Sequence, residues 1–495
     1  MSDKSLEKED RIASDVVPLN EKLAYGFSQL PGTFYGAMIG VIQSFYYGWM
    51  GLQNFWIVIA QIFYAIWNVV NDPLLGNRIN NTKYYNKKKG EYQRYLPYIK
   101  YGAPIFSICF ALVFFPPSSL KGQPNNLTAQ VWLFVWYLSS LTAYDTMFTL
   151  VLCAHVALLP QMTLNQRERE KIQLLSTMFS VPAILIGFIL PVQYLANPTA
   201  TSIAQFQALV IGVAAFGVVP YLILSKVVHE HGEFVPEDTR GVIESLKIAL
   251  KNKSFIQYVI YDGVSVFILN ILITSLPFYL TWVLAPLGTD LLLFFIGPIV
   301  CLLISIPLIL KIAEKFSTKA SISYSLAVLT IGFFFTFIAG LIGNWPLISV
   351  GFSIVFLAFA GDFIQHNPMR ADTIDYDYWK VSGERREGLY AGIGPLLSKP
   401  LISVALAVPT ALMTVFGLIY VESADGLVPT QGMAAASFSV NLSFSLIPGI
   451  VSLIGFIIWV KYYPLTGEVV KEMKAELAKM HEQKKKEYEK KISEI

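Results

Sequence analysis

The stretch LLLFFIGPIVCLLISIPLIL, residues 291–310, decides the fold class of this chain. It carries no charged residue, and about 20 such residues form a helix that crosses a hydrocarbon core of roughly 30 Å. The whole chain is similar in character, because 54% of its 495 residues are hydrophobic and only 14% are charged. In soluble proteins roughly a quarter of all residues are charged. We therefore expect an all-α membrane protein.

Apolar segments of this kind follow one another along the whole chain. They are too long and too uniformly apolar for the alternating strands of a membrane barrel. The sequence therefore predicts twelve transmembrane helices. The predicted spans are residues 23–50, 53–77, 97–119, 128–159, 172–195, 203–227, 254–284, 287–312, 319–342, 346–369, 389–420 and 437–463.

Lysine and arginine are unequally distributed between the loops. If the loops are numbered in order, the odd-numbered ones contain one basic residue, Lys121, whereas the even-numbered loops and both termini contain nearly all the others. Basic residues stay on the cytoplasmic side of a membrane. We expect a multi-pass protein of the plasma membrane with both termini in the cytoplasm.

A polar stretch at the midpoint, HEHGEFVPEDTRGVIESLKIALKNK (229–253), predicts a cytoplasmic central loop. It separates an N-terminal bundle of six helices at 23–228 from a C-terminal bundle at 254–463. The flanking segments are predicted to be a cytoplasmic tail at 1–22 and a charged, solvated cytoplasmic helix at 464–495.

Each half carries a charged loop after its fourth span, LPQMTLNQREREK (159–171) and RADTIDYDYWKVSGERREG (370–388). Corresponding loops in corresponding places favour the parallel repeat of major-facilitator carriers, whose substrate site lies between the halves. The alternative is that any helical membrane protein needs charged cytoplasmic loops. We expect the two loops to make cytoplasmic contacts that hold an outward-open state.

Four segments resemble the glycoside–pentoside–hexuronide cation symporters, the family of the melibiose permease. IWNVVNDPLLG (66–76) is similar to the cation motif of the family, and ALLPQMTLNQRERE (157–170) to its loop after span 4. ADTIDYDYWKVSGERREG (371–388) resembles the loop after span 10, and YPLTGE (463–468) the exit from span 12. The resemblance implies two six-helix bundles around a central cavity, working by alternating access, and uptake of sugars with Na⁺, Li⁺ or H⁺.

The resemblance implies a cation site at Asp72, since a charged group within the hydrocarbon is costly and indicates function. Asn68, Asn71 and Thr149 are the other candidate ligands, Asn68 lying one helical turn before Asp72. The family has a second carboxylate where this chain has Asn68, which leaves Na⁺ coupling, H⁺ coupling and uncoupled transport open. The alternative is that Asp72 pairs with a basic residue such as Arg78. We expect no other metal and no cofactor.

The resemblance is weaker for the sugar site. Where the family has acidic, aromatic and basic sugar contacts, this chain has Thr33, Leu152, Val156 and Thr177, and only Lys399 matches an intramembrane lysine. Other polar residues lie in the spans, and His366 shares a helix face with Asp362 four residues earlier. Each could instead be a structural contact between helices. The candidate substrate-binding residues are Lys399, Asp145, Asp262, Thr33, Asp362 and His366.

Six aromatic residues of spans 1 and 2 are further candidates for stacking on a ligand, although such residues more often face lipid or anchor the interface. They are Tyr35, Phe45, Tyr46, Trp49, Tyr64 and Trp67.

These features predict a secondary active transporter that moves a sugar or related polar solute together with H⁺ or Na⁺. The loss of the sugar contacts leaves a lipid or lysolipid carrier on the same scaffold as an alternative. A polytopic membrane enzyme or a non-transporting sensor is a third hypothesis. No Walker loop occurs, so we expect no ATP-driven pump. The expected partners are a small solute and the lipid bilayer, not nucleic acid, and the expected state is a monomer.

Overall fold

The computed structural model describes residues 16–80, 82, 84–86, 91–163, 166–195, 198–230, 247, 250–381, 387–421 and 426–477. Most of the predicted central loop at 229–253 lies outside these residues, as do parts of the predicted tails. The described chain is almost entirely helical and divides into two compact units. The first comprises Met1–Thr239, Leu276–Phe278 and Met413–Gly432, and the second Arg240–Ser275, Tyr279–Leu412 and Met433–Ile495.

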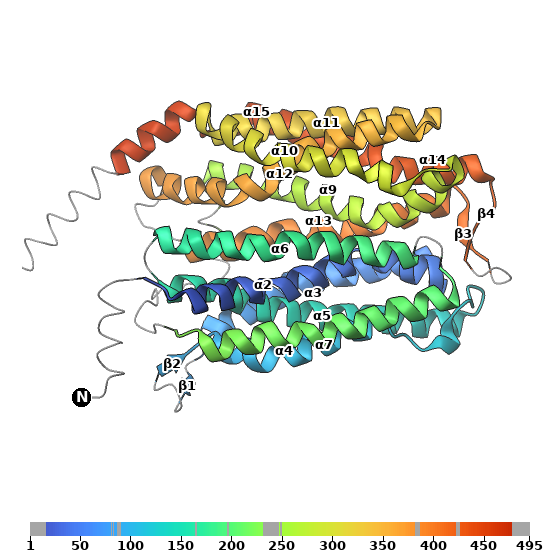
Figure 1. The fold of residues 1–495 in the computed structure, drawn as a ribbon, viewed down its shortest axis with the longest axis horizontal. Helices are drawn as coiled ribbons and strands as arrows, with labels where there is room; N and C mark the ends of the chain where they lie inside the picture. Colours follow the sequence, from blue (N-terminus) through green and yellow to red (C-terminus); the bar gives the residue numbers. More distant parts are fainter. Residues whose placement is uncertain are drawn as a thin grey trace, which may run out of the picture. The chain divides into compact units, whose positions relative to one another are not determined.

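The first unit contains six long helices. They run side by side (Figure 1). Its elements are α2 (Leu19–Ile39), the π-helical η1 (Ser44–Met50), α3 (Asn54–Asn80), α4 (Leu96–Val113), the 3-10 turn η2 (Ser118–Leu120), α5 (Leu127–Met162), α6 (Gln166–Leu195) and α7 (Ala200–Val227). Helix α2 packs against α6 and α7, and α5 packs against α3 and α4.

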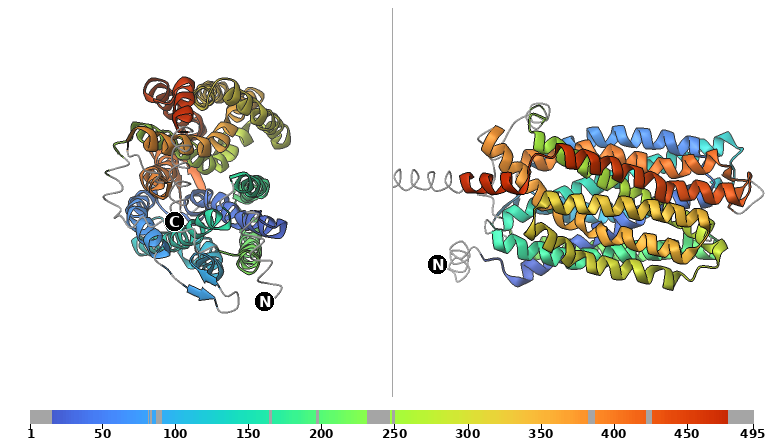
Figure 2. Two further views of the ribbon diagram at one scale, coloured as in Figure 1. Left: turned by 90° about the vertical axis from the view of Figure 1, so that its left-hand side faces the viewer. Right: turned by 90° about the horizontal axis from the view of Figure 1, so that it is seen from above.

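The second unit is built from the remaining helices, which Figure 2 shows from two further sides. Its elements are α9 (Lys253–Tyr279), η4 (Leu280–Leu284), η5 (Ala285–Leu287), α10 (Leu291–Lys315), α11 (Thr318–Ile342), α12 (Trp345–Tyr376), η6 (Asp377–Val381), α13 (Glu387–Val415), α14 (Met433–Asn441), η7 (Leu442–Leu446) and α15 (Ile447–Tyr462). Helix α12 packs against α10 and α11.

Strands occur only as short hairpins in the described residues. β1 (Tyr84–Asn86) pairs antiparallel with β2 (Glu91–Gln93), and β3 (Leu418–Tyr420) pairs antiparallel with β4 (Leu427–Pro429). Both hairpins lie in loops between long helices.

The helices match the predicted spans. Within the described residues, ten are long and apolar enough to cross a membrane. The other two predicted spans correspond to α2 and α6, which are 21 and 30 residues long and carry charges such as Glu21 and Glu168 near their amino ends. The prediction of an all-α membrane fold is therefore confirmed.

Side-chain caps begin several helices where the apolar segments start. The Asn126 side chain accepts a hydrogen bond from the Ala129 backbone N–H at the start of α5. Thr199 and Ser202 form a reciprocal capping box at the start of α7. Such caps satisfy backbone N–H groups that have no partner within the helix.

The aromatic residues of the first two spans lie mainly inside the first unit. Tyr35 stacks on Phe110 with ring centroids 4.1 Å apart, and both rings are fully buried. Of the six aromatic candidates only Trp67, which is 43% exposed, lies at the surface. The expectation that these residues face lipid is therefore wrong for Tyr35, Phe45, Tyr46, Trp49 and Tyr64, because they fill the space between helices.

The chain is helical again over 467–477, after α15. Met473 and Leu477 of this segment pack against Tyr378 of η6, and Met473 is fully buried. Lys474 forms a 3.7 Å ion pair with Asp372 of α12. The tail helix is therefore not solvated all round, because its apolar residues at helical spacing give it one face that packs on the second unit.

Candidate functional site

The first candidate site lies between α3 and α5, in the first unit. The Thr149 hydroxyl donates a 2.9 Å hydrogen bond to Oδ1 of Asp72. Asn68 and Asn71 precede Asp72 on α3 and are both buried, at 3% and 7% exposure. Of the four residues predicted as cation ligands, the structure thus joins Asp72 and Thr149. The role of all four stays a prediction.

Arg78 is poorly placed to be the partner of Asp72. Six positions separate the two residues on α3, so they lie roughly 120° apart around the helix axis. The Arg78 side chain is exposed, whereas Asp72 lies toward α5. The hydrogen bond from Thr149 of α5 therefore explains the orientation of Asp72 better than an ion pair with Arg78 does.

Asp145 also faces α3. Its Oδ1 accepts a 2.9 Å hydrogen bond from the Tyr64 hydroxyl, and the residue is only 4% exposed. Tyr64, Asn68 and Asp72 lie four residues apart on α3, and therefore form one row on the same face. Asp145 belongs with this row, although it was predicted among the substrate ligands.

The second candidate site lies in the second unit, between α9 and α12. His366 of α12 places Nε2 2.9 Å from the Tyr258 hydroxyl and 3.6 Å from Oδ1 of Asp262. Asp262 is 7% exposed. The structure thus joins two predicted substrate ligands from different spans, and it adds Tyr258, which the sequence did not single out.

The structure adds little on the other three predicted substrate residues, Thr33, Lys399 and Asp362. The Thr33 hydroxyl donates a 3.0 Å hydrogen bond to the Gln29 carbonyl of its own helix. Lys399 lies half-buried in α13. The side chain of Asp362 is outside the described part of the structure, so the predicted pair with His366 is not tested.

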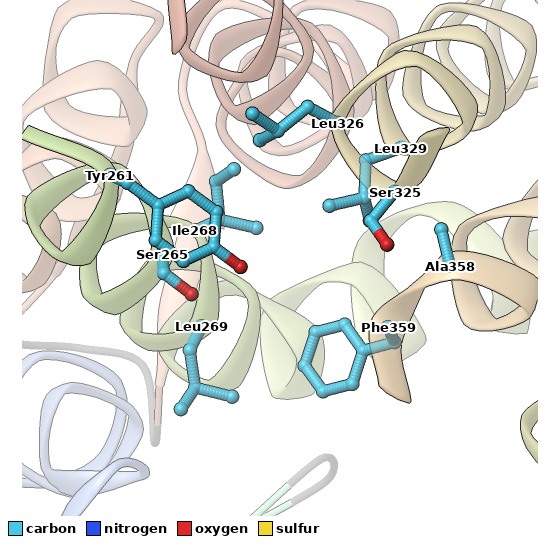
Figure 3. A pocket seen from close by; sticks show the side chains of 9 residues that line it. All are labelled: Tyr261, Ser265, Ile268, Leu269, Ser325, Leu326, Leu329, Ala358 and Phe359. Carbon is cyan, nitrogen blue, oxygen red and sulfur yellow. The ribbon is translucent and has the colours of Figure 1, made fainter. Parts of the chain in front are cut away.

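A small cavity lies close to the second site, lined by α9, α11 and α12 (Figure 3). The side chains of Tyr261, Ser265 and Ser325 bring hydroxyl groups to a lining that is otherwise apolar. Its volume of about 20 Å³ holds about one water molecule. This cavity is therefore too small for a sugar.

The sequence reasoning missed a buried histidine of α5. The ring of His155 stacks on Tyr25 of α2 with centroids 4.2 Å apart, and its Nε2 lies 2.7 Å from the Ser28 hydroxyl. The residue is fully buried. Its position as an ionisable residue inside an apolar span could have marked it as a candidate.

The charged loop after the fourth span is anchored within the first unit. The Glu168 carboxylate pairs with Lys22 of α2 and, at 2.8 Å, with Lys171. Hydrogen bonds from Lys171 and Lys22 lower the pKa of Glu168 to about 2. This loop therefore ties α6 to the beginning of α2, and its predicted contribution to an outward-open state stays a prediction.

The two units of long apolar helices define a multi-pass membrane protein with charged residues buried between its helices. A family model described as "MFS/sugar transport protein" matches residues 22–467. The chain belongs to this family and is a transporter, not an enzyme. The resemblance noted in the loop motifs is thereby confirmed at the level of the sugar-transport family of the major facilitator superfamily.

Known proteins agree with this assignment. An uncharacterized symporter of Synechocystis sp. is 26% identical over 188 residues, which are 36% of this chain and 31% of that protein. The match thus spans about a third of the length of that relative.

Solved structures of transporters share the fold. The chain matches the nucleoside transporter NupG with a TM-score of 0.56 at 13% identity, over 90% of this chain and 100% of that one. It matches the E. coli xylose transporter XylE with a TM-score of 0.56 at 12% identity, over 92% and 98% of the two chains. It matches a bacterial homolog of the human lysosomal transporter Spinster with a TM-score of 0.57 at 12% identity, over 90% and 96%. At these identities the likeness is one of fold.

Proposed function

We propose that this transporter is a symporter that moves a sugar or related polar solute together with a monovalent cation, by alternating access across the plasma membrane. The observation that carries the proposal is the contact between Asp72 and Thr149, at 2.9 Å. An ionisable residue within a spanning helix marks an ion or substrate pathway by default. The family of sugar transporters and the symporter relative support the solute class and the coupling.

The cation would bind at Asp72 with the help of Asn68, Asn71 and Thr149. Carboxylate, amide and hydroxyl oxygens are ligands that hard cations prefer. The solute would contact Asp262, His366 and Lys399 of the second unit. A carboxylate and an imidazole can each hydrogen-bond a sugar hydroxyl.

The test is transport by the purified protein in proteoliposomes. A panel of labelled sugars and sugar acids is offered under an inward Na⁺ gradient, an inward H⁺ gradient and no gradient. We expect one gradient to drive accumulation of one of these solutes, and Asp72→Asn to abolish that accumulation. Glu314→Gln is the control, because it removes one charge from an exposed position at the end of α10. Accumulation that Asp72→Asn leaves unchanged would show that Asp72 is not the coupling residue.

One observation favours the lysolipid alternative. A groove on the outer side of α3 and α5 is lined mainly by apolar residues, and its Phe63 and Trp67 are 53% and 43% exposed. Such a surface suits an acyl chain. Stabilisation of the purified protein by lysophospholipids, with no response to the sugar panel, would favour this function over sugar symport.

A further inference from the structure

One segment from the second half of the chain packs on the first unit. Residues Met413–Gly432 carry the β3–β4 hairpin and belong to the first unit by their contacts, whereas the chain up to Leu412 and the chain from Met433 belong to the second. We call Met413–Gly432 the strap. It contains the loop between predicted spans 11 and 12, which the distribution of lysine and arginine predicts to be extracellular.

The strap is attached first through the side chain of Tyr47, in η1. The Tyr47 hydroxyl donates to the carbonyl oxygen of Leu418 and lies 3.0 Å from the hydroxyl of Thr414. A carbonyl oxygen only accepts, so the single Tyr47 proton goes to Leu418 and the Thr414 hydroxyl donates to Tyr47. Tyr47 is 2% exposed. Two hydrogen bonds thus join η1 to the beginning of the strap.

The second attachment is the ring of Tyr420, in β3. A Cβ at Gly51 would lie 2.9 Å from this ring, and one at Gly122 would lie 3.3 Å from its hydroxyl oxygen. Both glycines have a positive φ, 77° and 71°, which glycine adopts without strain. Tyr420 is 8% exposed. Its ring therefore fills a slot that two glycines keep free of side chains.

Two glutamines of the first unit hold this slot together. The Gln130 side chain accepts from the backbone N–H of Gln53 at 2.9 Å and donates to the carbonyl oxygen of Gly51 at 3.0 Å. The Gln53 side chain donates to the carbonyl oxygen of Pro124 at 2.7 Å. None of these three bonds involves the strap. We therefore expect the slot to keep its shape when the strap leaves it.

Both attachments are of a kind that can be released. They consist of two hydrogen bonds between neutral groups and one inserted ring, and a single hydrogen bond shifts an equilibrium by only about fivefold. Both ends of the strap continue into the second unit. In alternating access the two halves of a carrier move against each other. The strap must then leave the slot, or it would hold the two units in one arrangement.

We propose that the strap is an extracellular latch. Tyr420 in the slot of Gly51 and Gly122, together with the bond from Tyr47 to Leu418, holds the outer side of the transporter closed, and both contacts break when that side opens. This inference rests on the alternating access of the proposed function and names residues that control one of its steps. It does not depend on which solute or cation is carried.

The test measures release of the strap by the reactivity of a buried thiol. Leu418→Cys places a thiol at a position that is 0% exposed and keeps the backbone carbonyl that Tyr47 binds. Its rate of reaction with a membrane-impermeant maleimide is measured on the purified full-length protein in detergent. The parent chain gives the background rate, since its own cysteines lie in long helices, at Cys109, Cys153 and Cys301.

Two variants weaken the latch at its two attachments. Tyr47→Phe removes one hydroxyl and keeps the ring, and we expect it to speed the labelling of Leu418→Cys about fivefold. Tyr420→Ala empties the slot and should speed this labelling at least about tenfold, because a buried aromatic ring is lost. Tyr101→Phe is the control, because it removes a hydroxyl from a 59% exposed ring of α4 and should leave the rate unchanged.

A second thiol separates release of the strap from general loosening of the first unit. Val113 is the last residue of α4 in the same unit and is also 0% exposed. We expect Tyr47→Phe to leave the labelling of Val113→Cys unchanged. Rates that rise together at 113 and 418 would show a merely structural role of Tyr47 and overturn the latch. An unchanged rate at 418 would also overturn it, and Tyr47→Phe decides the question if Tyr420→Ala does not fold.

A cross-link tests whether the strap must leave during transport. A Cβ at Gly426 of the strap would lie 3.9 Å from the carbonyl oxygen of Gly48 in η1, so the double variant Gly48→Cys with Gly426→Cys can be joined by a short bis-maleimide. We expect the joined protein to lose accumulation of the labelled sugars in proteoliposomes, relative to the same variant before reaction. Accumulation that survives the cross-link would overturn the latch and leave the symporter standing.

Two further outcomes separate the latch from the proposed function and from its predicted side. Faster labelling of Leu418→Cys in Tyr47→Phe, together with no gradient-driven accumulation of any solute by the wild type, would overturn the symporter and support the latch. Labelling of Leu418→Cys that occurs in cells only after permeabilisation would place the strap in the cytoplasm and overturn an extracellular latch.

Discussion

The backbone N–H of Leu96 donates a 2.6 Å hydrogen bond to Oε1 of Glu230, which lies 134 residues later in the chain. The same carboxylate accepts from the backbone N–H groups of Arg94 and Tyr95 at 2.6 and 3.0 Å. Glu230 is 5% exposed and follows the end of α7. The first residues of the central loop thus cap the amino end of α4, where a negative charge also meets the positive end of the helix dipole.

Glu230→Ala should destabilise the first unit. Loss of a capping side chain costs about 1–2 kcal/mol, and here three N–H groups lose their acceptor. Thermal unfolding in detergent measures the loss. Glu314→Ala makes the same change at an exposed helix position and should be nearly neutral. Equal stability of the two variants would show that water replaces the carboxylate at the amino end of α4.

Lys22→Met should destabilise the protein more than Lys171→Met, although both lysines bind Glu168. The Lys22 side chain is 11% exposed and the Lys171 side chain 63%. Removing one partner of a buried pair costs on the order of 3 kcal/mol. An exposed pair contributes less than about 1 kcal/mol. Similar losses in the free energy of unfolding would show that burial does not decide the strength of these contacts.

The Glu168 contacts should weaken in acid. The pKa of Glu168 is lowered to about 2 from an ordinary value of 4.5, so the folded state binds its proton less readily than the unfolded state. The stabilisation is therefore complete above pH 4.5 and is lost as the pH falls through 2. We expect the stability difference between wild type and Glu168→Gln to narrow over this range. A difference that stays constant with pH would mean that the Glu168 charge contributes nothing.

Gly51→Ala should cost more than Gly288→Ala. Both glycines have a positive φ, 77° and 63°, where an alanine is strained by about 1–2 kcal/mol. A Cβ at position 51 would also lie 2.9 Å from the ring of Tyr420, whereas one at position 288 meets no described atom within 4 Å. Thermal unfolding of the two variants isolates the cost of the clash, since the strain is common to both. Equal losses would indicate that the Tyr420 ring moves aside freely.

The cation candidates illustrate how far sequence reasoning reaches. The spacing of Asn68 and Asp72 places them on one face of a helix, and the motif resemblance pairs Asp72 with Thr149, as the structure shows. Asp145 was recognised as a polar residue within a span, but its partner was not. The partner, Tyr64, is 81 residues away, and no pattern along the chain specifies how α5 is rotated relative to α3.

In the second unit, too, the sequence identified the polar residues but not their partners. His366 and Asp262 were each identified as polar residues in apolar spans, but His366 was paired with Asp362 on its own helix. The structure places His366 against Tyr258 and Asp262 of α9, contacts that depend on the packing of α12 against another element.

The sequence by itself determined the all-α membrane class and the positions of the spans, because hydrocarbon forces each crossing segment to satisfy its own backbone hydrogen bonds. It also indicated polar residues within those spans that avoid lipid, such as Asp145 and Asp262, although not His155. Only the tertiary structure decided which of these polar residues meet, such as Tyr64 with Asp145 and Leu96 with Glu230. The physical reason is that helical periodicity orders residues around one axis, whereas the rotation and depth of each helix are set by packing against its neighbours.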